Sequence, residues 1–295
     1  MFRVRRLLAP FVLCIALLFS EAQAFTIAWL SDTQNYHNAY KPIFDGMTQW
    51  IADNREALDI RSVFHTGDVV GSWSSEDQWR QARESMGILS SASIPFLTVC
   101  GNHDIGYRMN YANFLKYVLS LRPASMSQEY GDTGSRYELF SANGRDYIFM
   151  GIAFSNKGPS EDEVNWINGV LRQYSSRDAI IITHSYLKKS AAYTTQGKAI
   201  FEKIVKANPN VFLVLCGHCR DISYKNVQLD DDGDGNPDRT VYAILSNFQG
   251  GKAGGGGYMR ILDFSDSDIY IYTYSPYYDS CEYPKGKTEA TVPLP

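Results

Sequence analysis

Short apolar runs alternate along this chain with longer segments of helical spacing. The runs are rich in β-branched residues, which is typical of strands buried in the centre of a sheet. They cover residues 25–30, 62–65, 96–100, 179–183 and 211–216. The pattern therefore predicts five central strands separated by helices or loops.

The segments between these strands repeat apolar residues every three or four positions, as an amphipathic helix does. One stripe runs from Ile43 to Leu58, and a second, behind a Ser-Ser-Glu start at Ser74, runs from Trp79 to Leu89. Residues 161–174 and 199–207 have the same spacing. We expect four helices here.

Other stretches alternate apolar and polar residues with the period of antiparallel strands. Residues 136–141 and 146–152 flank Asn143-Gly144, a pair suited to a tight hairpin turn. Residues 241–247, 258–264 and 269–274 continue the alternation towards the C-terminus. No linker-like composition or internal repeat divides the chain, so we expect one α/β domain with two packed sheets and helices outside.

Five of the predicted strands are followed at once by residues that bind metals or exchange protons. These exits read Asp32-Thr-Gln34, Gly67-Asp68, Gly101-Asn102-His103-Asp104, Thr183-His184 and Gly217-His218. A single Asp or Asn-His at such a place is usually a helix cap or a turn. Four of the five histidines, however, lie in or beside these exits, and such clustering predicts a site with two metal ions on the sheet. His65, inside a strand, is expected in the core or behind the site, and His37 in an ordinary loop.

The ordered set of exits resembles the calcineurin-like metallophosphoesterases over nearly all of the chain after Thr26. That family carries Asp-x-His, Gly-Asp-x-x, Gly-Asn-His-Asp/Glu, His and Gly-His-x-His after successive strands. The resemblance implies a four-layer α/β sandwich with two packed mixed β-sheets between helices.

The resemblance also implies roles for individual residues. Asp32, Gln34 and Asp68 would hold the first metal, and Asp68, Asn102, His184 and His218 the second. Mixed oxygen and imidazole ligands suit Mn²⁺, Fe or Zn²⁺. Because two divalent cations repel each other, a shared carboxylate and a shared hydroxide are needed between them. His103 is the expected general acid, with Asp104 orienting its imidazole.

Two departures from the family pattern fall on the first metal. Gln34 stands in place of a histidine, as in the branch that resembles manganese-dependent ADP-ribose and CDP-alcohol diphosphatases. Arg220 stands where the last histidine is usual, and a guanidinium cannot ligate a metal. We expect a weakly held first metal and a substrate phosphate bound by Arg220. Tyr186 and Lys188 could face the same anion or belong to a solvated basic loop.

Two further segments have unusual composition. Asp230, Asp232, Asp234, Asn236 and Asp238 space oxygen side chains like the start of a calcium loop, although Val241 occupies the place of its last glutamate. A solvated turn explains the same spacing. Residues 250–257 are mostly glycine and predict a mobile loop that could line the site.

The first 24 residues predict export. Arg3, Arg5 and Arg6 precede an apolar run to Phe19 that is shorter than the roughly twenty residues of a membrane span, and Ala22-Gln23-Ala24 suits a signal peptidase. We expect cleavage near Ala24, no stable membrane anchor, and a mature protein of residues 25–295 in the periplasm or outside the cell. Loss of this segment would change the net charge from −4 to −6, which argues against nucleic acid as a partner.

Three functional hypotheses follow. The first is a hydrolase that acts on a small phosphomonoester or phosphodiester, nucleotide-type pyrophosphates included. The second is a non-catalytic binding protein of the same fold. The third is a thiol-disulfide oxidoreductase that uses Cys216 and Cys219, although the sequence after Cys219 lacks the helical periodicity that this chemistry needs.

Overall fold

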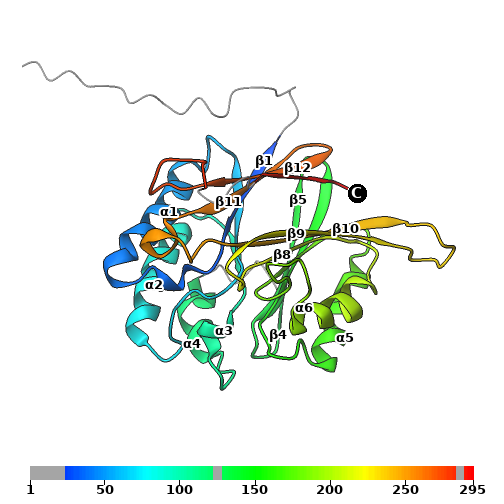
Figure 1. Cartoon of the computed structure of the whole chain (residues 1–295), viewed down its shortest axis with the longest axis horizontal. Helices are drawn as coiled ribbons and strands as arrows, with labels where there is room; N and C mark the ends of the chain where they lie inside the picture. Colours follow the sequence, from blue (N-terminus) through cyan, green and yellow to red (C-terminus); the bar gives the residue numbers. More distant parts are fainter. Residues whose placement is uncertain (1–23, 122–127, 284–288) are drawn as a thin grey trace, which may run out of the picture.

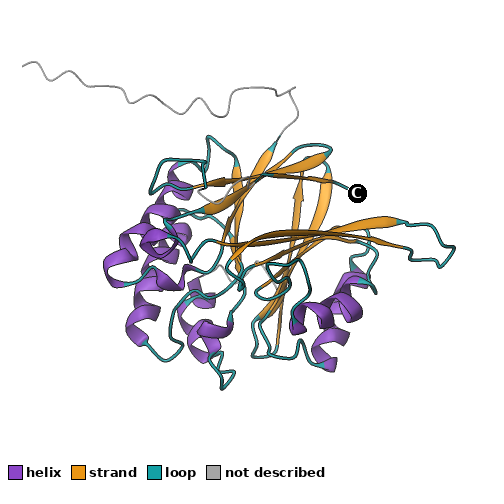
Figure 2. Ribbon diagram, viewed as in Figure 1, coloured by secondary structure: helices purple, strands orange, loops and turns teal. Residues whose placement is uncertain are grey.

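Two mixed β-sheets stacked face to face form the centre of the protein. The computed structural model describes residues 24–121, 128–283 and 289–295. One sheet has six strands in the order β13-β12-β11-β1-β2-β3, and the other has seven in the order β4-β5-β6-β7-β8-β10-β9. Figure 2 shows helices outside both sheets, so the predicted four-layer α/β arrangement is confirmed.

The first sheet is assembled from both ends of the described chain. Parallel pairing joins β1 to β2 and β2 to β3, whereas β11, β12 and β13 pair antiparallel. Its strands are β1 (Phe25–Leu30), β2 (Ile60–His65), β3 (Phe96–Thr98), β11 (Met259–Phe264), β12 (Asp268–Tyr274) and β13 (Ala290–Pro293).

The second sheet is parallel in its middle and antiparallel at both edges. Strands β6, β7, β8 and β10 run parallel. The strands are β4 (Gln128–Tyr130), β5 (Ser135–Ala142), β6 (Arg145–Ile152), β7 (Asp178–Thr183), β8 (Val211–Cys216), β9 (Asp221–Leu229) and β10 (Arg239–Asn247). Asn143 and Gly144 both have positive φ, 54° and 72°, as the predicted tight hairpin turn requires.

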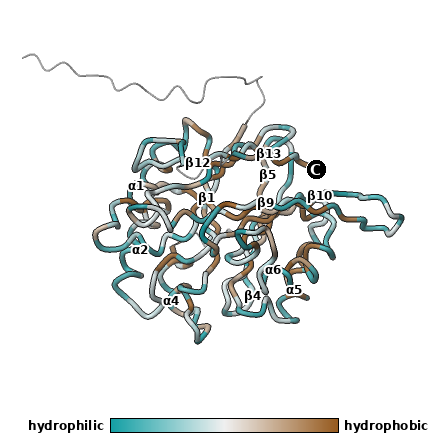
Figure 3. Tube along the Cα trace, viewed as in Figure 1, coloured by the Kyte–Doolittle hydropathy of each residue, from teal (hydrophilic) through white to brown (hydrophobic). Residues whose placement is uncertain are grey.

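Alternation along the strands divides the core into separate clusters on the two faces of each sheet. Phe25, Ile27 and Trp29 point towards the second sheet, whereas Ala28 and Leu30 point towards the helices. Figure 3 shows the hydrophobic stretches running along these central strands. Since Phe25, Ile27 and Trp29 are all at most 1% exposed, the two sheets share a dry interface that holds their strand ends in a fixed relation.

The helices cover the outer faces of the two sheets (Figure 1). On the first sheet lie α1 (Lys41–Asp53) and α2 (Glu76–Ser91), with α3 (Asn102–Ile105) and α4 (Ala112–Tyr117) near them; on the second lie α5 (Glu161–Gln173) and α6 (Thr195–Ile200). The helix predicted over 199–207 begins earlier, at Thr195, because the Thr194 hydroxyl caps it by accepting from Gly197 N–H. It continues as one π-helical turn, Phe201–Val205. No helix of the described residues is long and apolar enough to cross a bilayer.

The glycine-rich segment differs from its prediction as a mobile loop. Residues Lys252–Gly255 form a 3₁₀ turn, η5, and φ is positive at every position from Ala253 to Gly257. Gly255, Gly256 and Gly257 are buried, and the Gly257 N–H donates to the Tyr36 hydroxyl at 2.8 Å. Glycine tolerates positive φ without a steric penalty, so the segment folds into a compact left-handed turn.

Candidate metal centre

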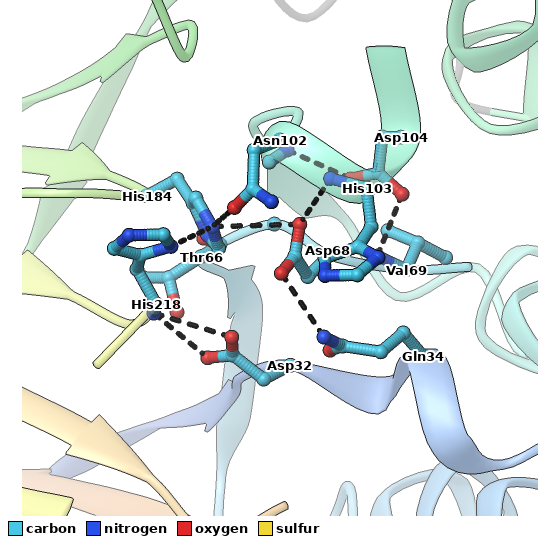
Figure 4. A network of polar contacts seen from close by, with 12 residues as sticks. Asp32, Gln34, Thr66, Asp68, Val69, Asn102, His103, Asp104, His184 and His218 are labelled. Atoms are coloured by element: carbon cyan, nitrogen blue, oxygen red, sulfur yellow. Dashed lines mark hydrogen bonds and ion pairs between the residues drawn. The ribbon is translucent and has the colours of Figure 1, made fainter. Parts of the chain in front are cut away.

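All five predicted exits lie at the carboxyl ends of strands β1, β2, β3, β7 and β8 (Figure 4). Asp32, Asp68 and His218 have φ of 52°, 55° and 69°, values that side chains other than glycine seldom adopt. Such strain persists only where the surroundings enforce it, and it gathers at functional sites. The tight turns bring side chains from both sheets to one place.

Glycines next to the candidate ligands allow this close approach. A Cβ atom on Gly101 would overlap the Asp68 carboxylate, and one on Gly217 would overlap the Asp32 carboxylate. Neither glycine has positive φ, so the lack of a side chain is what these positions require. Glycine therefore precedes Asn102 and His218 because a larger residue would collide with a candidate ligand.

The four residues expected to hold the second metal converge on His184. Its Nε2 atom lies 3.0 Å from Asn102 Oδ1, 3.2 Å from His218 Nδ1 and 3.4 Å from Asp68 Oδ1. Among the described residues, Asp68, His184 and His218 form one of two groups of three acidic, histidine or cysteine side chains whose ligand atoms lie within 4.8 Å of one another. One carboxylate, one amide oxygen and two imidazoles are a donor set for a divalent transition metal.

A backbone carbonyl sets the tautomer of His184. Thr66 O lies 2.8 Å from His184 Nδ1, and since a carbonyl only accepts, Nδ1 carries the hydrogen and Nε2 faces the ligand group. Burial lowers the pKa of this imidazole, but the carboxylates of Asp68 and Asp32 outweigh burial and raise it to about 9. For Asp68, burial is likewise outweighed by His184, and its pKa falls below the usual range. This buried attraction for positive charge is what a metal cation would exploit.

The side of the site expected to bind the first metal offers fewer ligand atoms than the other side. Both carboxylate oxygens of Asp32 accept from the His218 backbone N–H, at 3.2 and 3.1 Å, and the Ser31 hydroxyl also donates to this carboxylate. Burial, and the neighbouring Asp68 charge, raise the pKa of Asp32 to about 7. Two buried carboxylates so close together favour a bound cation between them.

Gln34 contributes an oxygen with no protein partner. Its amide nitrogen donates to Asp68 Oδ2 at 3.1 Å, whereas its Oε1 is buried and accepts no hydrogen bond from the residues that the structure describes. The side chain is 5% exposed. A buried acceptor left unpaired is unfavourable, and a hard cation would satisfy it, so the residues present fit a metal at this place.

His103 lies beside Asp68 and is exposed, but Asp104 does not orient it. The Asp104 carboxylate accepts from the backbone N–H groups of Gly101, Val69 and Val70 at 2.7, 2.8 and 3.0 Å. The imidazole instead contacts a carbonyl, with Nδ1 2.9 Å from Gly71 O. The predicted role of Asp104 is wrong, because backbone donors that follow β2 and β3 occupy both of its oxygens.

The three predicted substrate contacts have different surroundings. Tyr186 is 1% exposed and packs against the Tyr193 ring with centroids 5.3 Å apart, so it belongs to the core and its prediction is wrong. Lys188 is exposed in a small turn between Leu187 and Tyr193. Arg220 is exposed, two residues after His218, and its stem lies along Gly250. Lys188 and Arg220 are free to meet an anion.

The candidate calcium loop is the turn of the β9–β10 hairpin, which projects from the body in Figure 1. Asp230, Asp232 and Asp238 gather their carboxylates within 4.8 Å of one another, all exposed. Backbone N–H groups already occupy them: Asp230 accepts from Gly233 and Gly235 at 2.6 and 2.7 Å. Asp234 and Asn236 complete the turn through the hydrogen bond from Asn236 N–H to Asp234 at 2.7 Å. Calcium binding here stays a prediction.

The cysteines do not form a redox pair. Cys216 ends β8 rather than starting a helix, and neither it nor Cys219 is in a disulfide. Burial raises the pKa of the Cys216 thiol to about 12 and that of Cys219 above its usual value. A thiolate is the reactive species in thiol-disulfide exchange, so the strand position and the raised thiol pKa both argue against the thiol-disulfide hypothesis.

Two residues around the centre were not singled out in the sequence. Phe154 follows β6 and places its ring 5.6 and 6.1 Å from the imidazoles of His184 and His218. Asn247, at the end of β10, donates to the His218 carbonyl at 3.1 Å. Their places, just after β6 and at the last residue of β10, were the signal that could have found them. His65 is fully buried and lies 3.0 Å from the Thr33 hydroxyl, as expected for a residue behind the site.

Comparison with known proteins places this geometry in a family. A family model described as calcineurin-like phosphoesterase matches residues 25–219. The uncharacterized protein YvnB of Bacillus subtilis (strain 168) is 41% identical over 259 residues, which are 86% of this chain and 20% of YvnB. The chain thus spans about a fifth of the length of this curated relative.

Solved structures with the same fold include proteins of different descriptions. GAP50, described as the anchor in the inner membrane complex of Plasmodium, has a TM-score of 0.60 at 14% identity and covers 92% of this chain and 89% of its own. Purple acid phosphatase PPD1 from yellow lupin (Lupinus luteus) seeds has a TM-score of 0.59 at 13% identity, with 92% and 54% covered. Since the family model matches more than half of the chain, the protein belongs to the calcineurin-like phosphoesterase family.

Proposed function

We propose that this protein is an exported, metal-dependent phosphoesterase that hydrolyses phosphomonoester or phosphodiester bonds of small substrates. The observation that carries the proposal is the convergence of Asp68, Asn102 and His218 within 3.4 Å of the His184 Nε2 atom, with the exposed His103 imidazole beside them. That combination supplies a metal-binding group and an accessible acid in one place.

Different residues would have different roles around the reacting phosphate. Divalent cations, when bound, activate water and neutralise phosphate charge. Asp68 lies between the two ligand groups, in contact with Gln34 on one side and His184 on the other. As the water oxygen forms its bond to phosphorus and the bond to the leaving oxygen breaks, His103 Nε2 gives its proton to that leaving oxygen.

The substrate class is narrowed by two residues. Gln34 places an unpaired amide oxygen at the first-metal side. A glutamine at this position is the feature that resembles the manganese-dependent diphosphatases. Arg220 is an exposed cation two residues from His218 with no ion pair in the part of the chain that is described. A substrate with two phosphates, such as a nucleotide-type pyrophosphate, would use both features.

Hydrolysis of 4-nitrophenyl phosphate and bis(4-nitrophenyl) phosphate with added Mn²⁺ tests the activity. We expect the wild type to cleave at least one ester and Asp68→Ala to lose the activity by at least about a hundredfold, because it removes the carboxylate shared by both ligand groups. Circular dichroism should show the same fold for both proteins. A metal-loaded wild type that cleaves no phosphomonoester, phosphodiester or nucleotide pyrophosphate would instead support the non-catalytic binding protein.

Export has its own test. The proposal rests on the three arginines and the apolar run before Ala24, which lie outside the described residues. Expression in a Gram-negative host, followed by fractionation and N-terminal sequencing, should give a periplasmic protein that starts at or near Phe25. A full-length protein in the cytoplasm would contradict export without bearing on the hydrolysis.

A further inference from the structure

The exposed His103 imidazole is oriented by a single peptide group. Its Nδ1 lies 2.9 Å from the carbonyl oxygen of Gly71. A carbonyl can only accept, so Nδ1 carries a hydrogen and Nε2 is the nitrogen left to face a substrate. The rotation of the ring therefore depends on where the Gly71 carbonyl points.

The same peptide group is held from its other end by Gln78. The N–H of this peptide belongs to Ser72 and donates to Gln78 Oε1 at 2.9 Å. Gln78 Oε1 also lies 3.3 Å from the place of a Cβ atom on Gly71. A peptide that donates at one end and accepts at the other is fixed in its plane, and each hydrogen bond polarises the next.

Gln78 departs from its usual local role in making this contact. Ser75 caps α2 by accepting from Gln78 N–H at 3.4 Å, so Ser75 and Gln78 have the spacing of a capping box. In that motif the glutamine side chain bonds the N–H of the cap residue. Here the Ser75 N–H donates to Ser72 O at 3.0 Å instead, and Gln78 reaches past it to Ser72.

Asp104 stabilises the residues just before this peptide. Its Oδ1 accepts from Val69 and Val70 N–H. Side chains from α3 and α2 thus hold consecutive parts of the loop between β2 and α2, and they leave the Gly71 carbonyl directed at His103. The loop itself has no regular secondary structure that could fix the carbonyl.

We propose that Gln78 is a positioning residue for the general acid: it holds the Gly71–Ser72 peptide so that the Gly71 carbonyl orients His103 for proton transfer to the leaving group. This inference rests on the proposed phosphoesterase function. Gln78 acts through the backbone and does not contact the metal ligands. Its loss should therefore affect the proton-transfer step and leave metal binding unchanged.

A leaving-group comparison separates this role from a general loss of activity. Phenyl phosphate has a poor leaving group that needs a proton, whereas 4-nitrophenyl phosphate has a good one that needs it less. For Gln78→Met, which keeps the length of the side chain but has no acceptor, we expect kcat for phenyl phosphate to fall about tenfold more than kcat for 4-nitrophenyl phosphate. KM and bound Mn²⁺ should stay within about twofold of the wild type, because ligand groups are untouched.

Two variants serve as matched controls. Gln78→Glu keeps an acceptor oxygen for Ser72 N–H and should restore most of the phenyl phosphate activity. Ser75→Ala removes the cap of α2 without touching the Gly71–Ser72 peptide, and should lower thermal stability without a preference between the two esters. ¹⁵N spectra of histidine should show the Nδ1–H form of His103 in the wild type and lose that preference in Gln78→Met.

The possible outcomes distinguish a failure of the Gln78 positioning role from a failure of the proposed phosphoesterase function. A metal-loaded wild type that cleaves neither of these monoesters, nor an aryl phosphodiester, nor a nucleotide pyrophosphate overturns the proposed function. If His103→Ala shows the leaving-group effect but folded Gln78→Met does not, the positioning role is wrong and the function stands. An equal loss on both esters in Gln78→Met and Ser75→Ala would show that Gln78 only stabilises the helix.

Discussion

Three candidate ligands hold the backbone in a conformation that their side chains disfavour. Asp32, Asp68 and His218 all have positive φ, and each such residue typically costs on the order of 1–3 kcal/mol. Aspartate and histidine adopt this state more often than most residues, but less easily than glycine, so the preference of the side chain alone does not account for three such turns at one place. The strained turns place the ligand atoms, so stability and function oppose each other at these positions.

Gly217 makes the close approach of these turns possible, and its replacement should be damaging. A Cβ atom there would overlap the Asp32 carboxylate and the Ser31 hydroxyl, both buried. We expect Gly217→Ala to displace Asp32, to reduce the phosphoesterase activity by about a hundredfold or more, and to lower the bound Mn²⁺. Steady-state kinetics and metal analysis of the same preparation measure both effects.

Gly87 supplies the control for that experiment. It lies in α2, and no atom is within 4 Å of the place where its Cβ would be. Gly87→Ala should keep full activity. Gly217→Ala with wild-type kinetics and metal content would show that the Asp32 carboxylate can move without consequence, and would remove it from the ligand set.

The two metals should be held with different affinity. One side offers Asp68, Asn102, His184 and His218, whereas the other has Asp32 and Gln34, with Arg220 in place of an imidazole. After dialysis against buffer without metal, we expect about one Mn²⁺ per chain, because the side with fewer ligand atoms binds its ion more weakly. Two equally retained ions would contradict this asymmetry. Asp68→Ala, which removes the shared carboxylate, should retain neither.

Helix α2 connects the surface of the first sheet to the site through its first turn. Gln78 lies in its first turn, and Gly87, which has open space at the place of a Cβ atom, lies in its interior, where glycine weakens a helix. We expect Gly87→Ala to raise the free energy of unfolding by about 0.5–1 kcal/mol, the usual difference between glycine and alanine inside a helix. Urea unfolding followed by circular dichroism measures it. A lower midpoint would mean that the Cβ meets an obstacle.

Elements with strong periodicity were predictable, and their ends were less so. The strand predicted from Ser62 begins at Ile60, because Ile60 pairs with Thr26 of β1. That pairing is a tertiary contact and leaves no local mark. The stripe of α1 was followed to Leu58, but the helix ends at Asp53 and turns follow. The compact glycine-rich turn was missed because its partner, Tyr36, is more than two hundred residues away.

The candidate ligands could be found from the sequence because each follows a recognisable strand. The ordering of side chains within the site could not, since it depends on which backbone N–H groups lie within reach. Asp104 illustrates the limit: its place beside His103 suggested a direct contact, but Gly101, Val69 and Val70 N–H groups occupy its oxygens. The burial of Tyr186 could not be predicted either, because its contact with Tyr193 forms only in the folded chain.

At the scale of the whole molecule, the site joins the two sheets. Asp32 and Asp68 follow strands of the six-stranded sheet, and His184 and His218 follow strands of the seven-stranded sheet. The hydrophobic interface between the sheets fixes their strand ends. A cation held by residues from both sheets would therefore bind the native state and not the unfolded chain, so metal binding should stabilise the entire fold.

Removal of metal should accordingly lower the thermal stability. At a free Mn²⁺ concentration of about 100 times Kd, binding adds about 2.7 kcal/mol to the free energy of unfolding, which corresponds to roughly 5–10 °C in Tm for a domain of this size. Differential scanning calorimetry with Mn²⁺ and after chelation measures the shift. We expect Asp68→Ala to lose most of it, whereas Asp230→Asn, in the hairpin cluster, should keep it. A shift that survives in Asp68→Ala but disappears in Asp230→Asn would place the stabilising ion in the β9–β10 hairpin instead of between the sheets.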